Sequence, residues 1–250
     1  MCRLLGWAAR TPVTMADLLG EADLDAFTAL SRKHGDGWGI AWRDGRAVEC
    51  FTSPDAACYS RDYEQRTHAL ASDLGIVHLR WATLGLPVQP SNTHPFSDGD
   101  VAFAHNGSVR PPSALDELLS DKQQASMRGT TDSERYFRAV LTAAAEVPLR
   151  QSVAQVVDRI ARTKDITSLN CLLMTPDTLF AASRFNPGAE DDEGEDYFHL
   201  RYRVTDDVVV VASSGWGSDW QVLENGTLLT VDRATLETSV VSLDQVLTGS

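Results

Sequence analysis

The stretch MCRLLGW, residues 1–7, places a cysteine directly behind the initiator methionine, and an apolar run follows that cysteine. Removal of Met1 would make Cys2 the first residue, which would then carry both a thiol and a free α-amine. Their ordinary pKa values are about 8.5 and about 7.7–8.0, so the amine can accept the thiol proton. N-terminal nucleophiles work in this way, with the amine in the role of the triad histidine. Taken alone, Cys2 is better explained as a small buried apolar residue.

Composition limits the classes of partner that the protein can bind. The 250 residues carry a net charge of −13 without a basic cluster, which argues against nucleic acid and anionic membranes. The apolar start is shorter than a signal-peptide core, and no stretch approaches the ~20 apolar residues of a membrane span. We therefore expect a cytoplasmic protein with a single domain over residues 1–250.

Neither the cysteines nor the histidines are spaced as metal ligands. Cys50, Cys58 and Cys171 form no CxxC pair and are expected to be structural. The six histidines are scattered, without HxH or HExxH spacing. We expect no metal site and no cofactor.

Hydrophobic patterning predicts strands, then helices, then strands again. Asp23 is a candidate helix cap, and Asp44-Gly45 is a hairpin signal. The acidic run at 189–196 predicts a solvated loop, and the irregular stretch at 82–100, with three prolines, is of a length that is often functional. We expect strands at 3–9, 39–43, 46–53, 74–80 and 101–107, helices at 23–33, 61–71, 113–121, 132–146 and 150–163, and mostly strand thereafter. This order predicts an α+β fold of two mainly antiparallel sheets with helices outside.

Three further places offer chemistry, and each has a simpler explanation. Arg80, with Thr83 beside it, can clamp a carboxylate, although a lone arginine is more often in a surface salt bridge. Asn106 and Gly107 can form an oxyanion hole, although Asn-Gly after a strand usually marks a turn. Asp132 can pair with an ammonium group, or it can cap the helix that follows.

The combination favours chemistry over the separate explanations. A terminal thiol, a carboxylate clamp, an oxyanion pair and an ammonium acceptor together fit an amide of the γ-carboxyl of glutamate. Arg80 would hold the α-carboxylate and Asp132 the α-amine. Cys2 would attack the γ-carbonyl, whose oxygen Asn106 and Gly107 would stabilise.

The order of the motifs resembles a known family. MC at 1–2, HGDGWG at 34–39, HLRWAT at 78–83, NTHPF at 92–96, HNG at 105–107 and TDSE at 131–134 follow one another. In this the chain is similar to the class II glutamine amidotransferases, the N-terminal-cysteine branch of the Ntn hydrolases, and the segment 208–232 resembles the closing strands of stand-alone members.

The resemblance implies a fold and a set of roles. The fold would be a four-layer αββα sandwich. Cys2 would be the nucleophile, Asn106 and Gly107 the oxyanion hole, and Asp132 the binder of the α-amino group. Arg80 and Thr83 would bind the α-carboxylate, and Trp81 and His94 would belong to a loop that closes over glutamine.

Two departures separate the chain from the synthase-linked members. Leu84 stands where they carry a histidine, and Lys33 stands near the place of an arginine before the aspartate. The chain is more similar to stand-alone members, which include the γ-glutamyl amidohydrolase of ergothioneine biosynthesis and small amidotransferases of unassigned substrate.

These features predict an enzyme that hydrolyses glutamine or a γ-glutamyl conjugate through a Cys2 thioester. One alternative is a glutaminase subunit that passes ammonia to a separately encoded synthetase. The other is a protein that binds γ-glutamyl ligands without turning them over, which the presence of Cys2, Asn106 and Asp132 disfavours.

Overall fold

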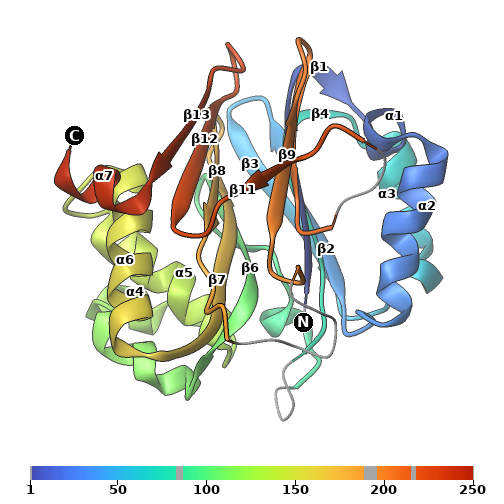
Figure 1. The fold of residues 1–250 in the computed structure, drawn as a ribbon. Coiled ribbons are helices and arrows are strands. Elements are labelled where there is room, and N and C mark those ends of the chain that lie inside the picture. The colour runs from blue at the N-terminus through green and yellow to red at the C-terminus, as the bar shows by residue number, and fades with distance from the viewer. Residues whose placement is uncertain (1, 83–86, 189–195, 215–217, 250) are drawn as a thin grey trace.

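Two antiparallel sheets stacked face to face form the centre of the computed structural model, with helices covering both outer faces (Figure 1). The structure describes residues 2–82, 87–188, 196–214 and 218–249. The layer order is helices, sheet, sheet, helices, which confirms the predicted α+β sandwich of four layers.

The first sheet contains both the strand that follows Cys2 and the strand that leads to Arg80. In spatial order its strands are β11 (Gln221–Leu223), β9 (Leu200–Val204), β10 (Val208–Ala212), β1 (Arg3–Val13), β4 (Ser72–Leu79), β2 (Trp38–Asp44) and β3 (Ala47–Ser53). β1 is therefore a central strand, with β10 on one side and β4 on the other.

The second sheet carries the Asn-Gly pair on an inner strand. Its strands are β13 (Thr238–Ser242), β12 (Thr227–Asp232), β8 (Thr178–Ser183), β7 (Asp165–Met174), β6 (Val101–Arg110) and β5 (Phe96–Asp98). β6 pairs with β7 and β5, so its middle is supported from both sides.

The helices divide between the two outer layers, as Figure 1 shows. The first sheet is covered by α1 (Met15–Leu19), α2 (Glu21–Ala29) and α3 (Arg61–Ala69), and the second by α4 (Asp121–Ala125), α5 (Asp132–Ala143), α6 (Leu149–Thr163) and α7 (Leu243–Thr248). Short 3-10 turns span Leu30–Arg32, Ala57–Tyr59, Pro90–Asn92 and Pro112–Leu118. No helix in these described ranges is long and apolar enough to cross a membrane.

The alternation of side chains along β1 explains why this strand lies in the middle. Leu4 and Ala8 face the core between the sheets, whereas Leu5 and Trp7 face the core beneath α1–α3. Residues 3–9 of β1 are all buried, so both faces of this half of the strand are packed and hold the residue before it in place. Gly75 on β4 leaves the space that the Trp7 indole fills.

The structure confirms some of the local predictions and contradicts others. The hairpin at Asp44-Gly45 is confirmed by the β2–β3 pairing. Asp23 is not a cap: α2 begins at Glu21 behind Gly20, whose φ of 77° favours glycine. The helix predicted at 113–121 is a 3-10 segment that ends at Leu118, with the separate α4 after it. The acidic run at 189–196 lies, up to 195, outside the described residues.

Candidate active site

Cys2 lies at the foot of β1, buried to 7% exposure. Because Arg3 pairs with Leu79, the register places Cys2 opposite the residue after β4, which is Arg80. The backbone N–H of Trp81 donates to the Cys2 Sγ at 3.5 Å, and this Sγ is 3.6 Å from the Trp81 carbonyl oxygen. Burial raises the pKa of the Cys2 thiol, while the Trp81 hydrogen bond and the positive charge of Arg80 lower it.

Arg80 is held by two loops that the sequence separates widely. Its Nη1 donates to the Asp36 carbonyl at 3.2 Å, and its Nη2 to the Pro87 carbonyl at 3.4 Å. The Asp36 carboxylate accepts the Ala82 N–H at 2.8 Å, and the Asp36 N–H donates to the Arg80 carbonyl. Asp36 thus fastens the glycine-rich loop at 34–39 against the arginine segment, a positioning role that the sequence analysis did not assign.

Asn106 and Gly107 lie inside β6, so the interpretation as a tight turn is wrong. Neighbouring strands override the local turn preference, with Asn106 opposite Asn170 and Gly107 opposite Leu169 on β7. A Cβ at Gly107 would collide with the Ser168 carbonyl oxygen, so this close approach requires glycine.

The Asn106 side chain on β6 is an unsatisfied buried polar group. It is fully buried, and within the described residues neither its Nδ2 nor its Oδ1 has a hydrogen-bond partner. Leaving buried polar atoms unpaired costs about 1–3 kcal/mol. Such a group in a native fold needs an explanation, and a catalytic role is one of those known.

Asp132 is the first residue of α5 and does not cap it, because the Thr131 side chain accepts the cap hydrogen bond from the Glu134 N–H at 3.1 Å. Asp132 is 4% exposed, and its Oδ2 accepts the Val109 N–H at 2.7 Å. Its negative charge raises the pKa of the Cys2 thiol, in addition to the larger effect of burial.

Asn92 connects the two halves of the site and was missed. Its Oδ1 accepts the Thr130 N–H at 2.9 Å, and its Nδ2 donates to the Pro87 carbonyl at 3.1 Å. Pro87 is also a partner of Arg80, while Thr130 lies two residues before Asp132. The only signal in the sequence was the asparagine of NTHPF, which carries no chemistry of its own.

The remaining predicted residues have different surroundings. The Trp81 ring is flanked by the Lys33 ammonium at 4.9 Å and by His34 at 5.5 Å. His94 is 3% exposed and stacks on His78, with the ring centroids 4.1 Å apart. Thr83, like Leu84, lies outside the described residues. A loop over bound glutamine that contains Trp81 and His94 stays a prediction.

Three buried histidines lie near one another: His78 and His94 stack, and His105 on β6 turns its ring toward Ser133 and Tyr136 of α5. His78 Nε2 is 3.3 Å from the His105 carbonyl, and His105 bonds Ser133 through Nδ1 and the Ser168 carbonyl through Nε2, both at 3.0 Å. Burial lowers the pKa of all three rings. In His78 and His94 the shift is large, and the charge of Arg80 adds to it.

This cluster predicts acid sensitivity. A histidine with a depressed pKa binds its proton more readily after unfolding, so stability is lost as the pH falls below the unfolded value of about 6.5. Between about pH 6 and about pH 5, His78 and His94 should together reduce the free energy of unfolding by up to about 2.7 kcal/mol per pH unit. Urea unfolding across this range measures the slope. In a His94→Phe variant the slope of the unfolding free energy against pH should fall by the contribution of one proton. An unchanged slope would contradict the role of His94 in the acid sensitivity.

Among the described residues, no group of three or more His, Cys, Asp and Glu side chains is arranged to hold a metal ion. The site is instead built from a thiol, an amide, a carboxylate and a guanidinium. These are the parts that acyl transfer from an amino-acid side chain needs.

Comparison with known proteins agrees with this geometry. The model of the class-II glutamine amidotransferases matches residues 1–246. The chain belongs to this family. As a class-II glutamine amidotransferase, it is 32% identical over 116 residues to the γ-glutamyl-hercynylcysteine sulfoxide hydrolase of Mycobacterium tuberculosis, a match that covers 44% of this chain and 50% of that protein.

Other relatives of this amidotransferase point the same way. A putative glutamine amidotransferase of Haemophilus influenzae is 33% identical over 143 residues, which cover 55% of this chain and 46% of the relative. The chain thus spans about half the length of these curated relatives. A class-II domain protein of Silicibacter pomeroyi has the same fold, with a TM-score of 0.69 at 21% identity over 96% of this chain and 99% of that one.

Proposed function

We propose that the protein hydrolyses a γ-glutamyl amide, either glutamine or a γ-glutamyl conjugate, through a thioester on Cys2. The observation that carries the proposal is the buried Asn106 amide, which has no partner among the described residues and lies on the strand that also needs glycine at 107. A carbonyl oxygen that becomes negatively charged is the acceptor that this amide lacks. Relatives that act on γ-glutamyl compounds support the same class of substrate.

The substrate's α-groups would be held by opposite charges. Arg80 would take the α-carboxylate, with Thr83 as a second donor, and the Asp132 carboxylate would take the α-ammonium. Since Arg80 lies opposite Cys2 in the β1–β4 register, a glutamyl chain bound between Arg80 and Asp132 would bring its γ-carbon to the thiol. Holding the chain at both ends turns the attack into an intramolecular step.

The reaction would run in two steps after removal of Met1. The α-amine of Cys2 takes the thiol proton, the sulfur bonds the γ-carbon, and the oxyanion rests on Asn106 and the Gly107 N–H. The C–N bond then breaks, and the leaving amine takes the proton from the α-ammonium. Water, deprotonated by the same amine, then attacks the γ-carbon; the C–S bond breaks, glutamate leaves, and the sulfur takes the proton back from the α-ammonium. Burial, which raises the thiol pKa, makes this internal base necessary at neutral pH.

The first experiment measures glutamate release by protein whose loss of Met1 has been verified by intact mass. Glutamine and a panel of γ-glutamyl amides would be compared, with hydroxylamine added to trap the acyl-enzyme as γ-glutamyl hydroxamate. We expect release of glutamate together with hydroxamate. Release from glutamine alone, and only with an added synthetase, would favour an ammonia-donating subunit, whereas ligand binding without release would indicate a binding protein.

A further inference from the structure

The segment Asp196–Leu200 lies across the nucleophile's strand from Arg80. The Arg3 guanidinium stands 4.2 Å above the Tyr197 ring, and its Nη1 lies 3.4 Å from the carbonyls of Tyr197 and Ser213. Arg3 is adjacent to Cys2 and only 8% exposed. The first side chain after the nucleophile thus holds this segment in place.

The same segment is also attached to β7, the strand that pairs with β6. Asn170, which faces Asn106 across the β6–β7 ladder, donates from Nδ2 to the Phe198 carbonyl. Its Oδ1 accepts the Arg184 N–H at 2.8 Å. In contrast to Asn106, Asn170 has both side-chain atoms satisfied, and it ties two segments to one point beside the oxyanion group.

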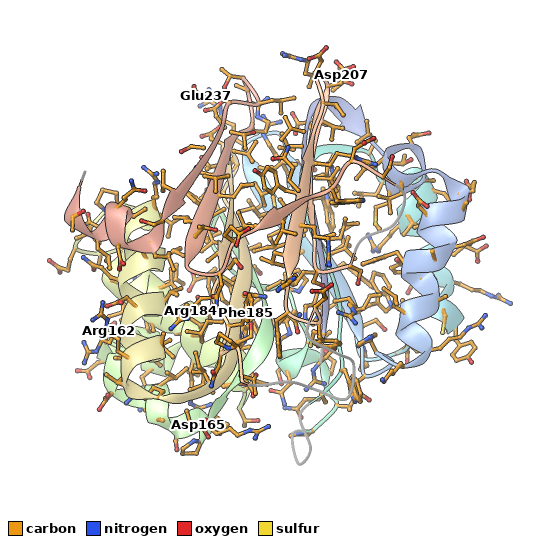
Figure 2. All side chains as sticks on the ribbon, in the orientation of Figure 1. Arg162, Asp165, Arg184, Phe185, Asp207 and Glu237 are labelled. Carbon is orange, nitrogen blue, oxygen red and sulfur yellow. The ribbon has the colours of Figure 1, made fainter. Side chains whose placement is uncertain are left out.

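Sheet order decides which part of a substrate would meet this segment. Arg80 follows β4 on one side of β1, whereas Ser213 follows β10 on the other side. A glutamyl group held at Arg80 and attacked at Cys2 would therefore point its leaving amine toward Tyr197 and Phe198. Figure 2 shows Phe185, after β8, between the two sheets, far from Asp207 and Glu237 at the opposite end of the sandwich.

The side chains that gather around Tyr197 and Phe198 are aromatic. Phe185, Tyr197 and Phe198 form one cluster, with 6.2 Å between the ring centroids of Phe185 and Phe198 and 5.3 Å between those of Tyr197 and Phe198. His199 and Arg201 lie 3.0 and 3.5 Å from the Asp196 carboxylate. The Arg3 guanidinium covers one face of the Tyr197 ring.

We propose that the cluster of Phe185, Tyr197 and Phe198 forms the leaving-group wall of the site and selects γ-glutamyl amides whose amine carries a flat apolar body. The inference rests on the proposed function and adds the class of leaving group to it. Ammonia from glutamine offers such a wall no surface, whereas a ring offers a face. Apolar complementarity of this size changes kcat/KM by about 10- to 200-fold.

The test compares γ-glutamyl phenethylamide with γ-glutamyl ethylamide, whose amines differ by a phenyl ring. We expect wild-type kcat/KM for the phenethylamide to exceed that for the ethylamide by about tenfold or more. Phe198→Ala should reduce the ratio to within about threefold, and Phe198→Leu should give an intermediate ratio. Phe180→Ala is the matched control, because Phe180 is equally buried but packs in the core beneath α5 and α6. It should keep the wild-type ratio despite a similar loss of stability.

Covalent labelling of Cys2 distinguishes failure of the leaving-group wall from failure of the proposed function. A glutamine analogue with a γ-chloromethyl ketone alkylates Cys2 if the glutamyl clamp and the nucleophile work. Labelling with no preference for the phenyl ring, or with the same ratio in Phe198→Ala, would overturn the leaving-group wall and leave the proposed function standing. Absence of both labelling and release would overturn the proposed function, and the wall with it.

Discussion

Replacing Cys2 with alanine should reduce γ-glutamyl amide hydrolysis by about 10⁴-fold or more, because no other group can form the thioester. Alanine is also small enough to permit loss of Met1, so the α-amine would be kept and only the thiol removed. Glutamate release and hydroxamate formation, measured on protein of verified mass, would report the loss. Binding of the substrate should survive, since Arg80 and Asp132 are unchanged.

The control for this substitution is Cys58→Ala, which removes a half-buried thiol from the short turn at Ala57–Tyr59. It should retain activity within about twofold, because surface substitutions away from special features cost within ±0.5 kcal/mol. A Cys2→Ala protein that keeps more than about one hundredth of wild-type activity would rule out the thioester.

Replacing Asn106 with alanine should lower kcat by about 10²- to 10³-fold with little change in KM, the effect of removing one oxyanion donor. Its effect on stability should be unusual. The side chain has no partner to lose, so its removal should be nearly neutral or stabilising for the fold. Steady-state kinetics would test the predicted loss of kcat, and urea unfolding of the same preparation would test the predicted stability.

Asn92→Ala is the comparison variant, and it should differ from Asn106→Ala in its effect on stability. Asn92 is equally buried but bonds the Pro87 carbonyl and the Thr130 N–H. Its loss should therefore cost about 1–3 kcal/mol of stability. If Asn106→Ala were to unfold as easily as Asn92→Ala while keeping its kcat, Asn106 would be a structural residue and the oxyanion assignment would be wrong.

Strand and helix patterns were readable from sequence where the pattern was long. The two helices after Asp132 carry apolar residues at helical spacing, and both occur as predicted to within a few residues, at Asp132–Ala143 and Leu149–Thr163. The short strands β5 and β11 were missed, because three residues are too few for a period-two pattern to show. The five-residue α1 was missed because it is too short for a helical period to show.

The sequence by itself determined which chemical groups the protein has and their order. Cys2, Arg80, Asn106, Gly107 and Asp132 were chosen because their functional groups complement one γ-glutamyl amide, and this choice needed no coordinates. The fold class followed from alternating and helical periods, which depend on local spacing alone.

Only the tertiary structure decided how these groups are held. An Asn-Gly pair favours a turn locally, but pairing with β7 makes 106–107 part of a strand, because ladder hydrogen bonds and packing outweigh a dipeptide preference. The supports at Asp36, Asn92 and Asn170 act through contacts 14 to 46 residues away in sequence. Such contacts arise when sheets and loops pack together, so no local pattern encodes them.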